Sequence, residues 1–415
     1  MNLNRVVVTG IGALTPIGNN IPEYWNALTN GKSGAAPITH FDSSNFKTQF
    51  ACELKNLTLQ EHLDRKEIRK YDNYTSYALI AVAESIEDAG FSLEKIDKNY
   101  AGVIWGSGIG GIKTFSDEIE SFIRGNKIPR FSPYFIPKMI ADIASGIISI
   151  KYGFQGPNFA TVSACASASH SIIDAFNYIR LGKANIFICG GSEASVHEAG
   201  VGGFNALKAL STQNESPQTA SRPFDVNRNG FVLGEGAGAL ILEEYNHAIN
   251  RGAKIYAEVV GAGMSADAHH ITAPHPEGLG AKNVMQQALL DAKISPNKID
   301  YINVHGTSTP LGDVSEMKAI HSVFQDDIYN LNISSTKSMT GHLLGAAGAI
   351  ESIACILAMK YGIVPPTINL ENLDPELDNK VNYTANKMEP RNITYSLCNT
   401  FGFGGHNASI IFKKI

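Results

Sequence analysis

The chain has 415 residues, of which 44% are hydrophobic and 18% charged, and its formal net charge at neutral pH is −5. This composition is typical of a well-packed globular protein with one large core or two fused cores. The negative charge argues against nonspecific binding of nucleic acid. No stretch approaches twenty consecutive apolar residues, and the N-terminus runs directly into a strand pattern at residues 5–8. We therefore expect a soluble, cytoplasmic protein with no membrane span.

Short apolar or β-branched runs alternate with helical stretches along the chain, and many of them adjoin glycine-rich turns. This alternation is typical of an α/β protein with buried strands. In chain order, the runs that we predict as strands are residues 5–8, 101–104, 186–189, 239–242, 301–304 and 408–412.

The chain also repeats itself over a long distance. Residues 99–108 resemble residues 299–308, each reading as a strand followed by glycine and a small hydroxyl residue. Residues 160–165 lead into a predicted helix over 166–181, and their counterpart at 331–337 leads through a glycine-containing turn into a helix that ends near Tyr361. We predict two βαβ-type halves, residues 1–255 and 256–415, packed as one body with ligands in the crevice at the strand ends.

Five widely spaced cysteines include no C-x-x-C pair. An odd number at such spacing predicts neither a disulfide framework nor a zinc site, so we expect free thiols and no bound metal. Cys165 differs from the rest because a strand pattern gives way to a helix pattern there, and a helix N-terminus favours a thiolate. Its small neighbours permit a sharp turn, as at other nucleophile elbows. The alternative is a buried structural cysteine, which fits Cys52, Cys189, Cys355 and Cys398 better.

Three histidines could assist Cys165. His170 is close in sequence, but five helical steps point it elsewhere, so we expect a structural role. His305 ends a buried strand and opens a Gly/Thr-rich loop, and His342 follows the mirrored strand at the start of a helix rich in small residues. A lone histidine is more often structural, but two just beyond strand ends favour a catalytic pair.

A glycine-rich segment near the C-terminus, residues 399–407, places three glycines among aromatic and amide residues. Such a loop can move or bring backbone N–H groups close to a ligand. An ordinary turn before the last strand remains the simpler interpretation of its composition.

Together these segments resemble the elongating 3-oxoacyl-[acyl-carrier-protein] synthases, the type II β-ketoacyl synthases of the thiolase-like superfamily. The resemblance covers nearly the whole chain, from residues 5–12 to 402–405. Its blocks stand in the family's order at residues 163–167, 222–225, 230–236, 305–313 and 337–348. It implies a thiolase-like fold, in which duplicated βαβ halves form a layered α-β-α-β-α body.

The resemblance also implies a reaction. Cys165 would take an acyl group from acyl carrier protein, and malonyl-carrier would then lose carbon dioxide to give the enolate that attacks the Cys165 thioester. His305 and His342 would hydrogen-bond the malonyl thioester oxygen, with Lys337 and Glu351 supporting the site electrostatically. Backbone N–H groups of Cys165 and Phe403 would hold the oxyanion of acyl transfer, and Phe403 would act as a gate.

Further residues match the family's binding positions. The resemblance implies that Thr307 and Thr309 lie near the carrier's pantetheine arm, and that Ile109, Phe135, Phe204 and Phe401 lie at the acyl pocket or the dimer contact beside it. No cofactor is expected, since the carrier protein brings the phosphopantetheine, and a homodimer is expected. The candidates for docking the acidic carrier are Arg65, Lys66, Arg69, Lys70, Arg130 and Lys208. His406 departs from the family pattern, which frequently has threonine there.

Three alternatives share some of these features. A thiolase has the same fold but uses a second cysteine as its base. This chain offers His305 and His342 instead, and Cys398, the only late cysteine, precedes the gate loop without a thiolase-like setting. A noncatalytic chain-length partner of polyketide assemblies would lack the nucleophile that Cys165 supplies. A papain-like protease pairs cysteine with histidine, but it would not explain Lys337, a second histidine or the internal repeat.

Overall fold

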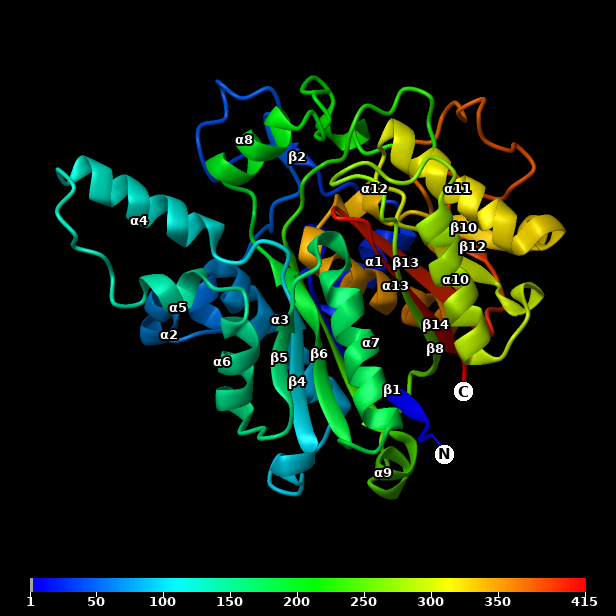
Figure 1. Ribbon diagram of the computed structural model, residues 1–415, viewed down its shortest axis with the longest axis horizontal. Helices are drawn as coiled ribbons and strands as arrows, with labels where there is room; N and C mark the ends of the chain where they lie inside the picture. The colour runs from blue at the N-terminus through cyan, green and yellow to red at the C-terminus, as the bar shows by residue number, and fades with distance from the viewer. Residues whose placement is uncertain (1–2) are drawn as a thin grey trace.

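The computed structural model describes residues 3–415, which form a mixed α/β body (Figure 1). Its strands are β1 Val6–Leu14, β2 Ala36–Pro37, β3 Phe50–Ala51, β4 Ala101–Gly106, β5 Asn158–Thr161, β6 Ile186–Glu193, β7 Gly236–Glu244, β8 Ala257–Ala266, β9 Tyr301–Asn303, β10 Asn332–Ser334, β11 Ile363–Val364, β12 Glu389–Pro390, β13 Tyr395–Gly402 and β14 His406–Lys413. Its α-helices are α1 Ile21–Thr29, α2 Arg65–Lys70, α3 Asn73–Ala89, α4 Ile112–Arg124, α5 Phe135–Met139, α6 Ile143–Tyr152, α7 Ser167–Arg180, α8 Glu198–Ala206, α9 Tyr245–Asn250, α10 Leu279–Ala292, α11 Pro310–Phe324, α12 Lys337–Thr340 and α13 Ala347–Tyr361. All six predicted strands and both predicted helices are present.

The largest sheet has ten strands in the order β10-β9-β13-β14-β8-β1-β7-β6-β4-β5. From its centre outward, β1-β7-β6-β4-β5 and β8-β14-β13-β9-β10 each make two antiparallel steps followed by two parallel steps. A short antiparallel pairing of β1 with β8 joins the two halves. This repeated topology confirms the predicted duplication, whereas the division at residue 255 stays a prediction.

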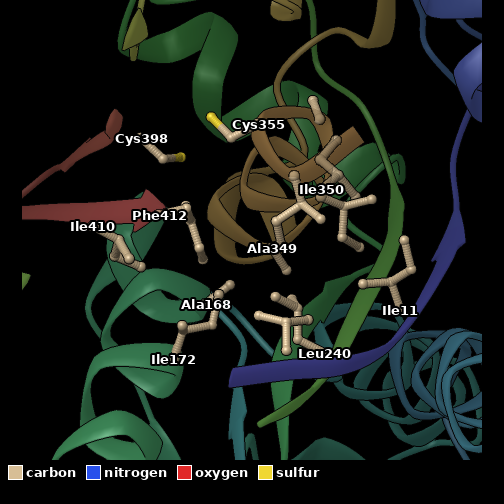
Figure 2. Packing of buried hydrophobic residues seen from close by; sticks show 14 of the residues in the cluster. Ile11, Ala168, Ile172, Leu240, Ala349, Ile350, Cys355, Cys398, Ile410 and Phe412 are labelled. Carbon is tan, nitrogen blue, oxygen red and sulfur yellow. The ribbon is translucent and has the colours of Figure 1, made fainter. Parts of the chain in front are cut away.

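Helices α7 and α13 lie between the two halves of the sheet and form the central layer. The strands alternate accordingly: on β6, Phe187 and Cys189 belong to the cluster around α7 and α13, while Ile186 and Ile188 belong to the cluster under α3 and α6. On the far side, α10 and α11 cover the strands of the second half. The predicted α-β-α-β-α layering is confirmed, and Figure 2 shows the central layer packed between β7 and β14.

Helix α13 is the most buried element of this layer. Together with the turn before it, the apolar stretch Leu344–Tyr361 has 18 residues, long enough to cross a membrane by length and composition alone. In the folded chain 89% of it is buried inside the protein. Packing of both halves of the sheet against this helix therefore accounts for its apolar sequence.

Helices α4 and α5 project from the body as an arm, at the left of Figure 1. Four phenylalanines stack along it, with ring centroids 5.3 to 6.3 Å apart: Phe115, Phe122, Phe131 and Phe135. Other apolar side chains of the arm are exposed, including Ile123 at 60% and Ile136 at 54%. An apolar surface of this kind on a projecting element indicates a contact with another molecule.

Candidate active site

Cys165 lies in a tight turn between β5 and α7. The turn is the short 3-10 segment Ala164–Ala166, in which Ala164 has a left-handed backbone with φ of +50°. Ser167 holds the turn, because its hydroxyl accepts from the Ser163 backbone N–H at 2.9 Å and donates to the Ala164 carbonyl at 2.7 Å. Strained turns of this kind are typical of nucleophile elbows. The predicted position of Cys165 at a helix N-terminus is therefore confirmed.

A second elbow stands at the equivalent place in the other half. The 3-10 segment Leu344–Ala346 precedes α13, and Leu344 has a left-handed φ of +45°. Gly345 occupies the position that corresponds to Cys165. The duplicated fold thus builds two elbows, of which one carries a thiol.

Both predicted catalytic histidines lie beside Cys165. His342 Nε2 is 3.0 Å from Cys165 Sγ, and the His305 ring centroid is 5.3 Å from that of His342 with the rings nearly perpendicular. Phe231 packs edge-on against His342, and the Glu316 carboxylate accepts from the backbone N–H groups of His305 and Gly306 at 2.9 and 2.8 Å. Phe231 thus packs against the His342 ring and Glu316 fixes the backbone at His305, while Nδ1 of each ring has no hydrogen-bond partner among residues 3–415.

The two imidazoles are neutral at physiological pH. Burial, and then the nearby Lys337 ammonium, hold the pKa of His305 and of His342 well below the ordinary value. Burial also raises the pKa of the Cys165 thiol to about 12, against the opposing effects of the Lys337 charge and of the Phe403 backbone. The expected thiolate is therefore wrong for the resting protein, because desolvation outweighs the helix terminus. The thiol is protonated at rest, with His342 in contact.

Lys337 and Glu351 form a buried ion pair behind these side chains. Both are almost wholly inaccessible, at 1% and 0% exposure, and the Lys337 ammonium donates to one carboxylate oxygen of Glu351. The other oxygen, Oε2, has no hydrogen-bond partner among residues 3–415. Burial raises the pKa of Glu351 to about 7, while Lys337 opposes that shift. A fixed positive charge is therefore held close to the sulfur and both histidines.

A cavity of about 520 Å³ opens onto Cys165. Ten of the predicted site residues line it: Ile109, Cys165, Phe204, Lys208, His305, Thr307, Thr309, His342, Phe401 and Phe403. The Thr307 and Thr309 hydroxyl oxygens are 3.0 Å apart, and Lys208 is exposed. Residues from both halves thus share one cavity, as the sequence predicts.

Phe135 lies elsewhere. It is on α5, stacked on Phe131 of the arm, and it does not line this cavity. Its assignment to the acyl pocket or to the dimer contact beside it therefore stays a prediction, since in a single chain the arm carries it away from this cavity. The basic residues predicted for carrier docking are also spread out, since Arg65, Lys66, Arg69 and Lys70 belong to α2 and Arg130 to the arm.

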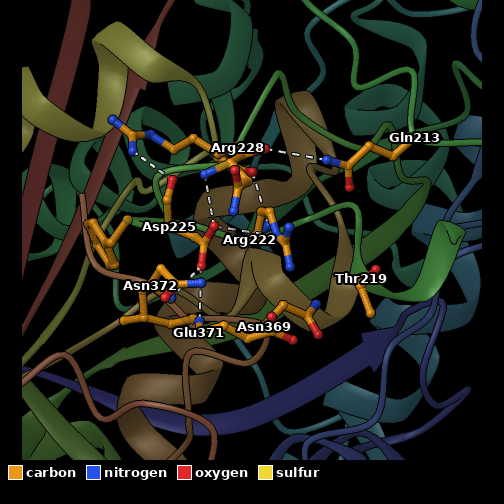
Figure 3. A network of polar contacts seen from close by, with 12 residues as sticks. Gln213, Thr219, Arg222, Asp225, Arg228, Asn369, Glu371 and Asn372 are labelled. Atoms are coloured by element: carbon orange, nitrogen blue, oxygen red, sulfur yellow. Dashed lines mark hydrogen bonds and ion pairs between the residues drawn. The ribbon is translucent and has the colours of Figure 1, made fainter.

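Sequence reasoning missed the acidic side chains that hold the site in place. Besides Glu316, the Glu193 carboxylate accepts the backbone N–H groups of Gly108 and Ile109, two residues that line the cavity. Arg228, which Figure 3 shows beside Asp225, donates to the carbonyls of Thr309 and Pro310 and pairs with Asp374. Glu193 is the last residue of β6 and Glu316 lies on α11, and exposed and buried carboxylates share such positions.

The thiolase alternative fails on the geometry of the cysteines. Within residues 3–415, Cys165 is the one cysteine that lines the cavity. Cys398 is fully buried on β13, in the central core with Cys355 (Figure 2). It cannot reach a substrate bound at Cys165, so no second thiol is available as a base.

Comparison with known proteins agrees with this site. Residues 3–248 match the family "Beta-ketoacyl synthase, N-terminal domain", and residues 256–371 match "Beta-ketoacyl synthase, C-terminal domain". The chain is 47% identical over 410 residues to 3-oxoacyl-[acyl-carrier-protein] synthase 2 of Synechocystis sp., covering 99% of this chain and 98% of that protein. It is also 47% identical over 411 residues to the protein of the same name from Staphylococcus aureus, with the same coverage.

Solved structures share the whole fold. A β-ketoacyl synthase from Burkholderia phymatum superposes with a TM-score of 0.93 at 35% identity, over 99% of this chain and all of that one. A type II polyketide ketosynthase solved in complex with its acyl-carrier protein superposes with a TM-score of 0.90 at 32% identity, over all of both chains. With both halves matched, the chain belongs to the β-ketoacyl synthase family.

Proposed function

We propose that the chain catalyses the decarboxylative Claisen condensation of malonyl-[acyl-carrier-protein] with an acyl group held on Cys165. The products are 3-oxoacyl-carrier and CO₂, and the step extends a growing fatty acid in a system of separate enzymes. The observation that carries this proposal is the meeting of Cys165, His305 and His342 in one cavity lined by both halves. The names of the full-length relatives support it.

In the first half-reaction, the Cys165 sulfur attacks the thioester carbonyl of acyl-carrier, and the carrier's pantetheine thiol leaves with a proton. His342 Nε2, 3.0 Å from the sulfur, is placed to accept the thiol proton during attack. Phe403 lines the cavity beside Cys165, so its N–H group, together with the Cys165 N–H, would stabilise the tetrahedral oxyanion. The acyl chain would extend past Ile109.

In the second half-reaction, the malonyl C–C bond to the carboxyl group breaks and CO₂ departs. The electron pair left behind forms an enolate, whose carbon attacks the Cys165 thioester and displaces the sulfur. Neutral His305 and His342 can donate N–H hydrogen bonds to the thioester oxygen where this charge develops, and Lys337 adds a fixed positive charge. The sulfur leaves as a thiolate, and the one proton that the condensation consumes, taken up from solvent, restores the thiol.

The partner is an acyl carrier protein that brings both substrates on its own phosphopantetheine arm. The Thr307 and Thr309 hydroxyls, which line the cavity, suit the amides of such an arm, and exposed Lys208 beside them suits an acidic carrier. The chain itself then needs no cofactor. The basic residues of α2 and Arg130 would extend the docking surface.

A homodimer in the cytoplasm is the form that we expect to act. Strand β5 ends the ten-stranded sheet and leaves one row of backbone groups open, and the arm adds an exposed apolar surface. Two copies that met along these features would bury both. All five cysteines are free thiols, as is usual for a reducing compartment.

The test uses purified protein, malonyl-carrier and a series of acyl-carriers from short to long. Cys165→Ala should abolish condensation and should take up no label from radiolabelled acyl-carrier. Cys189→Ala, which changes a buried thiol outside the cavity, is the matched control and should keep both activities. Label that persists on Cys165→Ala would mean that another residue is the nucleophile.

A further inference from the structure

Glu193 ends β6 as a fully buried carboxylate, and no cation pairs with it within residues 3–415. Its partners are instead backbone N–H groups: Gly108 donates to Oε2 at 2.8 Å, Gly345 donates to the same oxygen at 3.0 Å, and Ile109 donates to Oε1 at 3.2 Å. The Ser107 hydroxyl adds a weaker contact to Oε1 at 3.4 Å. One side chain therefore binds the Ile109 turn of the first half to the second elbow.

The protein is built closely around this carboxylate. A Cβ atom at Gly108 would lie 2.7 Å from Glu193 Oε2, and one at Gly345 would lie 2.8 Å from the same oxygen and 2.2 Å from the Gly108 nitrogen. Real side chains do not tolerate such distances, so glycine is required on both sides. The absence of a Cβ lets the two N–H groups converge on the carboxylate.

A carboxylate suits this place for a chemical reason. It offers acceptor sites on both oxygens, whereas an amide would turn a donor toward one set of N–H groups. Without a cation, these hydrogen bonds are what offsets the cost of burial, and burial raises the pKa of Glu193 to about 7. Burial of the Glu193 carboxyl group costs free energy, and this group is the one that binds the Ile109 backbone N–H.

Ile109 borders the cavity beside Cys165. The same region is lined by Gly108, Ala164 and Leu344. Gly108 lies close to the turn of Cys165, because a Cβ atom built on it would be 3.3 Å from the Ala164 carbonyl oxygen. An acyl group on Cys165 would therefore meet Ile109 as it lengthens. A shift of the Ile109 turn would change the length of chain that fits.

We propose that Glu193 is a positioning residue that fixes the Ile109 turn and thereby limits the length of acyl chain that the enzyme accepts. The proposal rests on the proposed condensation and deepens it. Glu193 acts through Ile109 and does not itself touch substrate.

Glu193→Gln is the test, measured as kcat/KM with butyryl-carrier and with myristoyl-carrier. The amide must turn its NH₂ group toward either Ile109 or the two glycines, which releases the turn. The ratio of kcat/KM for myristoyl over butyryl should rise about 5-fold, the scale of one lost hydrogen bond. A merely structural role would lower both values equally and leave the ratio unchanged.

The control is Glu84→Gln, because Glu84 also accepts two backbone N–H groups, from Ala13 and Ile21, at 2.8 and 2.7 Å, but lies outside the cavity. It should leave the ratio unchanged. Ile109→Ala should raise the ratio, and adding Glu193→Gln to it should give no further change. Additive effects in that pair would overturn the proposal.

Where Glu193→Gln fails to fold, Ser107→Ala replaces it, since the Ser107 hydroxyl contacts Glu193 and accepts from Gly110 N–H at 3.1 Å. A smaller rise in the ratio is expected. An unchanged ratio in an active variant overturns the role of Glu193 and leaves the condensation standing. Absence of condensation by the unmodified protein with every acyl-carrier would instead contradict the proposed function.

Discussion

At the scale of single residues, His305 and His342 are held as neutral hydrogen-bond donors, and this defines what their removal should cost. His305→Ala and His342→Ala should each slow malonyl decarboxylation by about 100- to 1,000-fold, the usual loss for one oxyanion-stabilising donor. For His305→Ala acyl transfer should fall less, because the His342 ring and the N–H groups of Phe403 and Cys165 serve that step, whereas His342→Ala also removes the group placed to accept the thiol proton. His321→Ala, at a histidine paired with Asp378 outside the cavity, is the control. Equal losses of His305→Ala in both half-reactions would contradict the assignment.

Glu316 predicts a dependence of stability on pH. Burial raises the pKa of this carboxyl from 4.5 to about 7, although hydrogen bonds from Gly306 and His305 oppose the shift. Because the folded pKa lies above the unfolded one, the stability contributed by the protonated group is fully present below pH 4.5 and is lost as pH rises through about 7. The free energy of unfolding in urea should be measured for the unmodified protein and for Glu316→Gln between pH 4.5 and about 7. As the pH rises through this window, the unmodified protein should lose stability relative to the glutamine variant. A difference that stays constant with pH would refute the assignment.

Sequence patterns could reveal some of these residues and not others. Cys165, His305 and His342 each follow a predicted strand and adjoin glycine or small residues, so their convergence could be predicted. Glu193 and Glu316 could not, because nothing in the sequence tells whether a glutamate at a strand end or within a helix accepts backbone N–H groups or faces water. The protonated state of Cys165 was also out of reach, since it depends on the depth of burial.

At the scale of elements, the close approach of α7 and α13 is the contact that builds the central layer. A Cβ at Gly348 would lie 2.1 Å from Ser169 Oγ. Gly348→Ala should therefore push the helices apart and lower the free energy of unfolding by about 1–3 kcal/mol, as overpacking does. Gly146→Ala on α6 meets no atom within 4 Å and should instead raise it by about 0.5–1 kcal/mol. Chemical denaturation of both variants checks this, and effects of the same sign would contradict it.

The elements themselves were largely predictable, and their arrangement less so. The strands predicted within residues 99–108 and 299–308 are β4 and β9. They could be predicted because buried strands followed by glycine turns leave a clear local pattern. The pairing of β1 with β8 joins residues 6–8 to 257–259 and depends on how the halves meet in space. The projecting arm has no local signature either, since its apolar residues read like those of a buried helix.

At the scale of the whole molecule, duplication produced two elbows, and the chain uses them differently. The first presents Cys165 to the cavity, whereas Gly345 in the second gives its N–H group to Glu193. The Glu193 carboxylate thus binds the backbone of the second elbow, whereas the first elbow presents its thiol to the cavity. This asymmetry explains why a symmetrical fold carries a single reactive centre per chain.

The exposed apolar arm gives the last prediction, a homodimer held in part by α4 and α5. Light scattering of the 44.6 kDa chain should give twice that mass, because two copies would bury the exposed apolar side chains of the arm and the open edge of β5. Ile123→Ser combined with Ile136→Ser should shift the protein toward monomer, since both side chains are more than half exposed in the single chain. Leu290→Ser on α10, at a side chain 77% exposed, should leave the mass unchanged. If the arm variant remained dimeric while Leu290→Ser dissociated, the interface would lie on the opposite half of the molecule.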